Sequence, residues 1–176
     1  MKIIIRTALI LALSASPASA YVYFTPESLV AEYFPGGETV ETVMFTPDVE
    51  AMRATLGYRL AKRQYEIQIA RKDDIVTGYL VIDEQLGLHE PITFGVLLDT
   101  EALVRRIEVM VYREAYGDGV RAATFREQFN GRDATSPMRA GKDIEVVSGS
   151  TVSTRSLCTG VRRASALVAA YIAEGP

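Results

Sequence analysis

A cluster of hydroxyl side chains surrounds Gly149, between a predicted short strand and the predicted start of the last helix. Its members are Ser148, Ser150, Thr151, Ser153 and Thr154. A helix N-terminus offers unpaired N–H groups and the positive end of a dipole, which suit a phosphate. Gly149 allows the backbone to approach a ligand closely, and Arg155 could add a positive charge. The pattern predicts an anion site, with simple helix capping as the alternative.

The inventory of reactive side chains excludes several kinds of site. One His and one Cys rule out a metal centre built from several such ligands. A Ser-His-acid triad would have to use His89, and no Gly-x-Ser-x-Gly turn accompanies it. Cys158 is predicted to be a buried, inert thiol. A net charge of −3 argues against a nucleic-acid partner. We therefore predict no catalytic residue and no metal.

The first twenty residues are typical of a secretory signal peptide. Lys2 and Arg6 precede an apolar run from Ala8 to Leu13, and Ala18-Ser19-Ala20 fits the cleavage rule. The alternative, a membrane anchor, needs about 20 apolar residues. Cleavage before Tyr21 predicts an exported protein, periplasmic or otherwise extracytoplasmic, that is soluble afterwards. A lone cysteine means that its stability must come from its core.

Local signals predict two helices and a run of strands in the first two thirds of the chain. One helix starts at Thr25-Pro26-Glu27 and ends near Tyr33, and the other starts at Thr46-Pro47-Asp48 and ends at Gly57. Strands are expected at Thr39–Phe45, around Tyr65–Ile69, and at Ile75–Asp83, Ile92–Asp99 and Leu103–Tyr112. Short connections between them favour an antiparallel meander.

The last third is predicted to be mostly helical. A short helix is expected at Val120–Phe129, a brief strand at Glu145–Val147 and a long helix from about Ser153 to Ala173. An apolar stripe on the long helix should pack on the sheet; it comprises Leu157, Val161, Ala164, Val168 and Ile172. The pairs Arg105-Arg106 and Arg162-Arg163 are interpreted as solvent-exposed.

These elements predict an α+β fold, an antiparallel twisted sheet with packing helices, in a single domain after the signal peptide. Residues 1–20 form the signal peptide. Residues 21–70 form an N-terminal helix and strand segment, and residues 71–176 carry the principal domain.

The stretch Glu-Val-Val-Ser-Gly-Ser-Thr, residues 145–151, resembles the flavinylation motif of FMN-binding domains, which runs Asp, two residues, Ser or Thr, Gly, Ala, Thr. Such domains occur in the G subunit of Rnf complexes, in the C subunit of sodium-pumping NADH:quinone oxidoreductase and in small exported flavoproteins. The resemblance extends over most of the chain after the leader. It includes Gly78-Tyr79, His89 to Phe94, Leu98-Asp99, Tyr112-Arg113-Glu114 with Gly117, and Phe125 to Gly131.

The resemblance implies FMN attached by a phosphoester to Thr151, placed there by a flavin transferase that uses FAD as the FMN donor. Ser150 is a less favoured acceptor. The motif departs from the family at Glu145, where the family has Asp, and at Ser150, where it has Ala. The implied cofactor-binding residues are Thr151, Ser148, Gly149, Ser150, Ser153, Glu114, Tyr116, Gly117 and His89.

Two of these residues have open alternatives. Tyr116 could stack on the flavin or cover the core, and Glu114 could contact the ring edge or be a solvated strand end. The implied function is an exported electron-transfer protein rather than an enzyme with its own substrate. Its redox partner protein could be membrane-bound. An exported binding module without flavin and a flavin-dependent reductase module are the alternatives.

Overall fold

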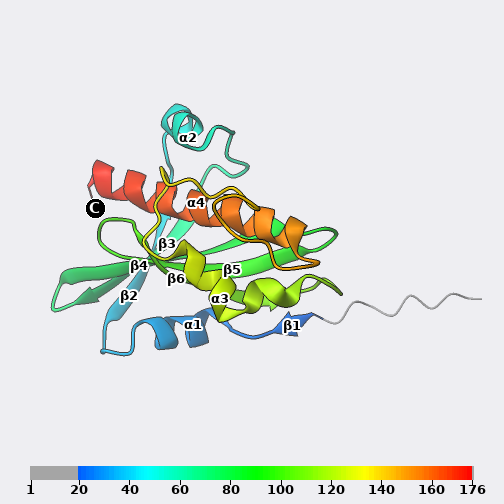
Figure 1. Ribbon diagram of the computed structural model, residues 1–176. Coiled ribbons are helices and arrows are strands. Elements are labelled where there is room, and N and C mark those ends of the chain that lie inside the picture. Colours follow the sequence, from blue (N-terminus) through cyan, green and yellow to red (C-terminus); the bar gives the residue numbers. More distant parts are fainter. Residues whose placement is uncertain (1–19, 176) are drawn as a thin grey trace, which may run out of the picture.

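Six strands form one antiparallel sheet in the computed structural model, which describes residues 20–175 (Figure 1). The predicted signal peptide, apart from Ala20, lies outside the described residues. The sheet order is β1-β6-β5-β4-β3-β2. The strands are β1 (Tyr21–Val22), β2 (Thr39–Phe45), β3 (Tyr65–Lys72), β4 (Ile75–Leu86), β5 (Pro91–Leu98) and β6 (Val104–Tyr112). Strands β2 to β6 follow one another as neighbours, so the predicted meander is confirmed.

The two faces of the sheet are covered by different helices (Figure 1). Helix α1 (Pro26–Tyr33) packs on one face, where Leu29 contacts β5 at Gly95. Helices α2 (Val49–Leu56) and α4 (Thr151–Glu174) belong to the larger core on the other face. Alternating residues of β4 point to the two cores, so this strand is apolar on both faces. The predicted division at residue 70 falls within β3, and both parts supply strands to this sheet.

Helix caps are set by the residues that precede each helix. Thr25 makes the expected cap on α1 and shares a reciprocal capping box with Ser28. On α2 the cap is Asp48, whose Oδ1 accepts from the Ala51 amide at 2.7 Å, so the predicted start at Thr46 is two residues early. Gly57 ends α2 in the left-handed conformation, with φ 82°.

Helix α4 lies directly on the sheet because small and apolar residues face it. Its predicted stripe is fully buried at Leu157, Val161, Ala164 and Val168, and Ile172 is partly buried. Gly160 permits the closest approach: a Cβ there would lie 2.2 Å from Phe94 Cζ. Any larger residue at this position would push the helix off β5.

An ion pair lies buried between α4 and β4. Arg163 is only 8% exposed, and its Nε and Nη2 donate to Asp83 Oδ2 at 2.8 and 2.5 Å. The prediction that Arg163 is solvent-exposed is therefore wrong. Its guanidinium can lie in the core because Asp83 supplies a counter-charge there and the Glu84 carbonyl accepts a further hydrogen bond.

The predicted helix at Val120–Phe129 is broken into three short pieces. They are η1 (Asp118–Arg121), α3 (Ala123–Arg126) and η2 (Glu127–Phe129). The break comes at Ala122, whose ψ of 137° is not helical. Phe125 and Phe129 still pack edge to face in the core, with ring centroids 5.6 Å apart.

The predicted strand at Glu145–Val147 is absent from the part of the chain that the structure describes. The Gln128 side chain takes the place of a strand partner there. Its Oε1 accepts from the Glu145 amide at 2.7 Å, and its Nε2 donates to the Glu145 carbonyl at 3.5 Å. Side-chain bonds thus satisfy backbone groups that a ladder would otherwise pair.

Replacing Asp83 tests how much the buried Asp83–Arg163 pair stabilises the fold. Asp83→Asn should lower the free energy of unfolding in a urea titration by about 3 to 5 kcal/mol, because it leaves a buried guanidinium without its counter-charge. Glu41→Gln is the matched control, since the Glu41–Arg71 pair is partly exposed and should contribute less than about 1 kcal/mol. Equal losses of stability in the two variants would contradict the conclusion that the buried pair stabilises the fold more than the partly exposed one.

Candidate functional site

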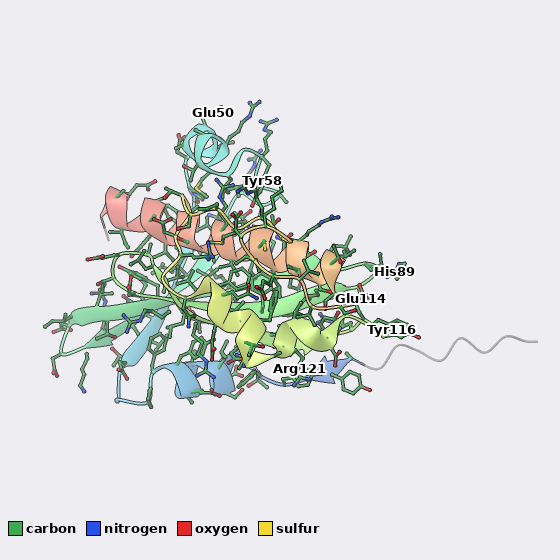
Figure 2. All side chains as sticks on the ribbon, in the orientation of Figure 1. Glu50, Tyr58, His89, Glu114, Tyr116 and Arg121 are labelled. Carbon is green, nitrogen blue, oxygen red and sulfur yellow. The ribbon has the colours of Figure 1, made fainter. Side chains whose placement is uncertain are left out.

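Three segments that are distant in the sequence meet at one end of the molecule and enclose a pocket of about 620 Å³. We call it the loop pocket. Its walls come from the β4–β5 connection, the segment after β6 and the start of α4. Figure 2 shows His89, Glu114 and Tyr116 together at this end. The lining residues are Leu88, His89, Glu90, Arg113, Glu114, Ala115, Tyr116, Gly149, Thr151, Val152 and Ser153.

Most of the predicted site residues line this pocket. The structure brings His89, Glu114, Tyr116, Gly149, Thr151 and Ser153 to its wall. The other three, Ser148, Ser150 and Gly117, lie beside these residues in the chain but do not line the pocket. Nothing in the local sequence pattern alone predicts that residues 87–90 and 113–117 should meet residue 149.

The two candidate acceptor hydroxyls differ in accessibility. Ser150 is 1% exposed, and its Oγ donates to the Val147 carbonyl at 3.0 Å. Thr151 is exposed and is the first residue of α4, which starts two residues earlier than the predicted Ser153. The accessible hydroxyl at the pocket is therefore that of Thr151, and it lies in the first helical turn rather than in a loop.

The N-terminus of α4 faces the pocket without a side-chain cap. Ser150 occupies the N-cap position but makes no side-chain cap hydrogen bond. Gly149 precedes it with a φ of 77°, in the left-handed region that glycine tolerates best. The first-turn amides of α4 thus remain available to an anion at the pocket wall.

A buried tyrosine, missed by the sequence analysis, joins two walls of the loop pocket. The Tyr112 hydroxyl donates to the Tyr116 carbonyl at 2.7 Å, so it accepts from Ser153 Oγ at 3.0 Å. Gly117, with φ 89°, leaves room for this contact, because a Cβ there would lie 2.7 Å from the Tyr112 hydroxyl oxygen. Burial raises the pKa of Tyr112, so the hydroxyl keeps its proton at neutral pH.

Glu114 holds the third wall of the pocket. Its Oε1 accepts from the amides of His89 and Glu90 at 2.6 and 3.0 Å. Burial of the carboxyl opposes ionisation, but hydrogen bonds from the amides of residues 88–90 outweigh it and lower the pKa of Glu114. The carboxylate is thus engaged with the loop backbone, and contact with a flavin ring stays a prediction.

The lining of the loop pocket includes exposed apolar side chains. Leu88, Tyr116 and Val152 line the pocket, and all three are exposed large hydrophobic residues. Tyr116 is 86% exposed, so it does not cover the core. Its ring is free to pack against a flat ligand.

None of the helices within residues 20–175 combines the length and apolarity needed to cross a bilayer. The same stretch contains no group of three His, Cys, Asp or Glu side chains that could hold a metal ion.

Removing the Tyr112 hydroxyl should loosen the pocket. In Tyr112→Phe, amides of residues 113–117 and 151–153 should exchange hydrogen faster, because the link between the two walls is lost at about 1 kcal/mol per hydrogen bond. Tyr65→Phe is the control, because the Tyr65 hydroxyl accepts from the Lys62 amide away from the pocket. Unchanged exchange at both segments in Tyr112→Phe would contradict the bridging role.

The hydrogen bonds from the His89 and Glu90 amides to Glu114 should depend on pH. A carboxyl whose pKa is lowered by folding stabilises the fold above its ordinary pKa, and this contribution is lost as the pH falls through the lowered value. The ordinary pKa of a glutamate carboxyl is 4.5. As the pH falls, the His89 and Glu90 amide resonances should therefore not yet move at this value, and their transition should come at a lower pH. Glu114→Gln should abolish this transition and Glu90→Gln should preserve it. A midpoint at or above the ordinary value would count against the tie.

The FMN-binding domain family matches residues 87–166, which include every residue that lines the loop pocket. No curated protein matches the sequence.

Two solved structures are similar in shape at low identity. One is the C subunit of the Na⁺-translocating NADH-quinone reductase from Parabacteroides distasonis, with a TM-score of 0.47 and 15% identity over 78% of this chain and 83% of that one. The other is NqrC from Shewanella oneidensis, with a TM-score of 0.48 and 13% identity over 74% of this chain and 79% of that one. The match to the FMN-binding domain family contains the motif, and it makes residues 87–166 of this chain similar to that family.

Proposed function

We propose that this protein is an exported electron-transfer flavoprotein that holds one FMN in the loop pocket, attached by a phosphoester to Thr151. The observation that carries the proposal is the exposed Thr151 hydroxyl at the uncapped start of α4, on the wall of the pocket. The family match over residues 87–166 supports FMN as the ligand.

The pocket suits a flavin in size and lining. Ligand pockets usually measure about 300 to 1,000 Å³ and combine apolar walls with a few placed polar groups. The loop pocket, at about 620 Å³, combines the exposed apolar side chains of Leu88, Tyr116 and Val152 with polar lining groups from the other two walls and the start of α4. The isoalloxazine ring would lie against these apolar side chains, and the bound flavin would supply the redox chemistry.

The start of α4 suits the phosphate. A phosphoester on Thr151 places the negative charge next to the first-turn amides and the positive end of the helix dipole. Gly149 leaves the approach open, since a Cβ at that position would meet nothing within 4 Å. Ser153 remains engaged with Tyr112 and helps to fix the turn that carries the acceptor.

Attachment requires a flavin transferase. Thr151 Oγ1 would bond to the phosphorus of the FMN half of FAD, the pyrophosphate bond would break, and AMP and the hydroxyl proton would leave. Glu145, which replaces the family's Asp, is exposed and accessible to such an enzyme. Ser150, which replaces Ala, turns its hydroxyl inward to Val147, so the substitution places no competing nucleophile at the surface.

Electron transfer is favoured over an enzymatic role because the sequence has one His and one Cys, and Cys158 is buried away from the loop pocket. The exposure of Leu88, Tyr116 and Val152 would let a redox partner protein, which could be membrane-bound, approach the ring edge. Covalent attachment suits export, because an esterified cofactor cannot be lost by dissociation outside the cytoplasm.

Removing the proposed acceptor tests the linkage. Thr151→Val, produced with a flavin transferase and exported, should give a folded protein with no flavin fluorescence on a denaturing gel, because the exposed side chain can change without disturbing the core. A fluorescent band in this variant would refute Thr151 as the acceptor.

Ser150→Ala separates the two hydroxyls. It restores the residue of the family motif and removes only an inward hydrogen bond to Val147, so covalent flavin should be retained at the wild-type level or above. Loss of the fluorescent band would assign the linkage, or an essential contact, to Ser150.

A further inference from the structure

A second pocket, of about 560 Å³, lies on the outer side of α4. We call it the arginine pocket. Its walls come from α4, from residues 135–140 and from the segment that follows α2, where Tyr58 contacts the Thr159 carbonyl through its hydroxyl at 3.4 Å. Figure 2 shows Tyr58 at this position, between α2 and α4. The two pockets share no lining residue.

Three arginines line the arginine pocket and no carboxylate does. They are Arg139, Arg155 and Arg162. Arg139 makes a two-point ion pair with Asp143. The Arg155 guanidinium is exposed and has no hydrogen-bond or ion-pair partner within residues 20–175. The pocket therefore carries an excess of positive charge on a chain whose net charge is −3.

Arg162 is fixed by backbone rather than by an acid. Its guanidinium donates to the carbonyls of Ala134, Leu56 and Thr55 at 2.8, 3.2 and 2.7 Å. These bonds join α4 to the C-terminal end of α2 and to the loop before residue 135. They leave the positive charge without a carboxylate counter-charge in the described chain, and they hold it at the pocket wall.

The loop at the opposite wall is already ordered. Asp133 Oδ1 accepts from the amides and the hydroxyls of Thr135 and Ser136, at distances from 2.7 to 2.9 Å. Such a closed turn needs little reorganisation when a ligand enters. The pocket is thus preformed rather than dependent on loop closure.

The inner wall of the pocket is apolar. It includes Leu56, Met138 and Cys158, which are all buried. Burial raises the pKa of the Cys158 thiol to about 12, so the group behaves as a neutral, inert part of the surface. A ligand here meets apolar side chains on one side and guanidinium groups on the other.

We propose that the arginine pocket binds a small organic anion, with an apolar body against the inner wall and a phosphate or carboxylate at Arg155. Its concave shape and volume fit a small molecule rather than a protein surface. The proposal does not depend on flavin attachment, because none of the residues that carry it lines the loop pocket.

The test uses the isotope-labelled mature protein and three probes: phenyl phosphate, benzoate and inorganic phosphate. Phenyl phosphate, benzoate or both should give saturable amide shifts at residues 135–140 and 155–162. Whichever binds identifies the head group. Inorganic phosphate should bind more weakly, because it lacks the apolar body. Arg155→Gln should weaken binding about fivefold, since one exposed charge contact is lost.

Arg105→Gln is the control, because it removes the same charge at another place. Arg105 is an exposed residue of β6 that pairs with Asp99, and it lines neither the loop pocket nor the arginine pocket. It should leave the affinity unchanged. The proposal is overturned if neither organic probe saturates, if the shifts fall only at residues 113–117 and 151–153, or if inorganic phosphate binds as tightly as phenyl phosphate. It is equally overturned if Arg155→Gln and Arg105→Gln change the affinity for the organic probe by the same factor.

Discussion

The position of α4 on the sheet is the constraint on which the rest of the structure depends. A 24-residue helix with an apolar stripe could slide along a flat surface, but two contacts fix it. Gly160 lies against the Phe94 ring, and Arg163 pairs with Asp83 in the core. Because these contacts lie on neighbouring strands, they set both the register and the direction of the helix. The place of Thr151, at its first residue, follows from them.

The loop pocket exists because polar groups tie two loops to that fixed helix end. Tyr112 joins the segment after β6 to Ser153, and Glu114 joins the same segment to the β4–β5 connection. The first of these contacts joins two side-chain hydroxyls, and the second joins a carboxylate to backbone amides, so side-chain hydrogen bonds hold the three walls together. The Thr151 hydroxyl is exposed at the pocket wall and suited to modification, whereas those of Ser150 and Ser153 are already engaged.

Much of the fold could be predicted because periodicity reports which residues are buried. Strand β2 has its predicted bounds, β4 to β6 differ from theirs by a few residues, and the stripe on α4 packs as expected. The errors arise where a single tertiary contact decides the local structure. Ala122 leaves the helical region within a sequence that favours a helix, and Gln128 replaces the strand expected opposite Glu145. Arg163 looks like a surface residue until its partner on β4 is known.

The site shows the same division. Spacing alone indicated an anion site near Gly149, and the family resemblance gave Thr151, Glu114, Tyr116 and His89. The resemblance included Tyr112 but gave it no role in the site, because that role depends on two hydrogen-bond partners that the chain brings together only on folding.

The most direct test of the account is the intact mass of the wild-type mature protein, exported from a host with a flavin transferase and followed by peptide mapping. The account predicts a mass gain of one esterified FMN, on the peptide that contains Thr151. An unmodified mass in a colourless protein would contradict it and would indicate a binding module that has kept the fold without the flavin.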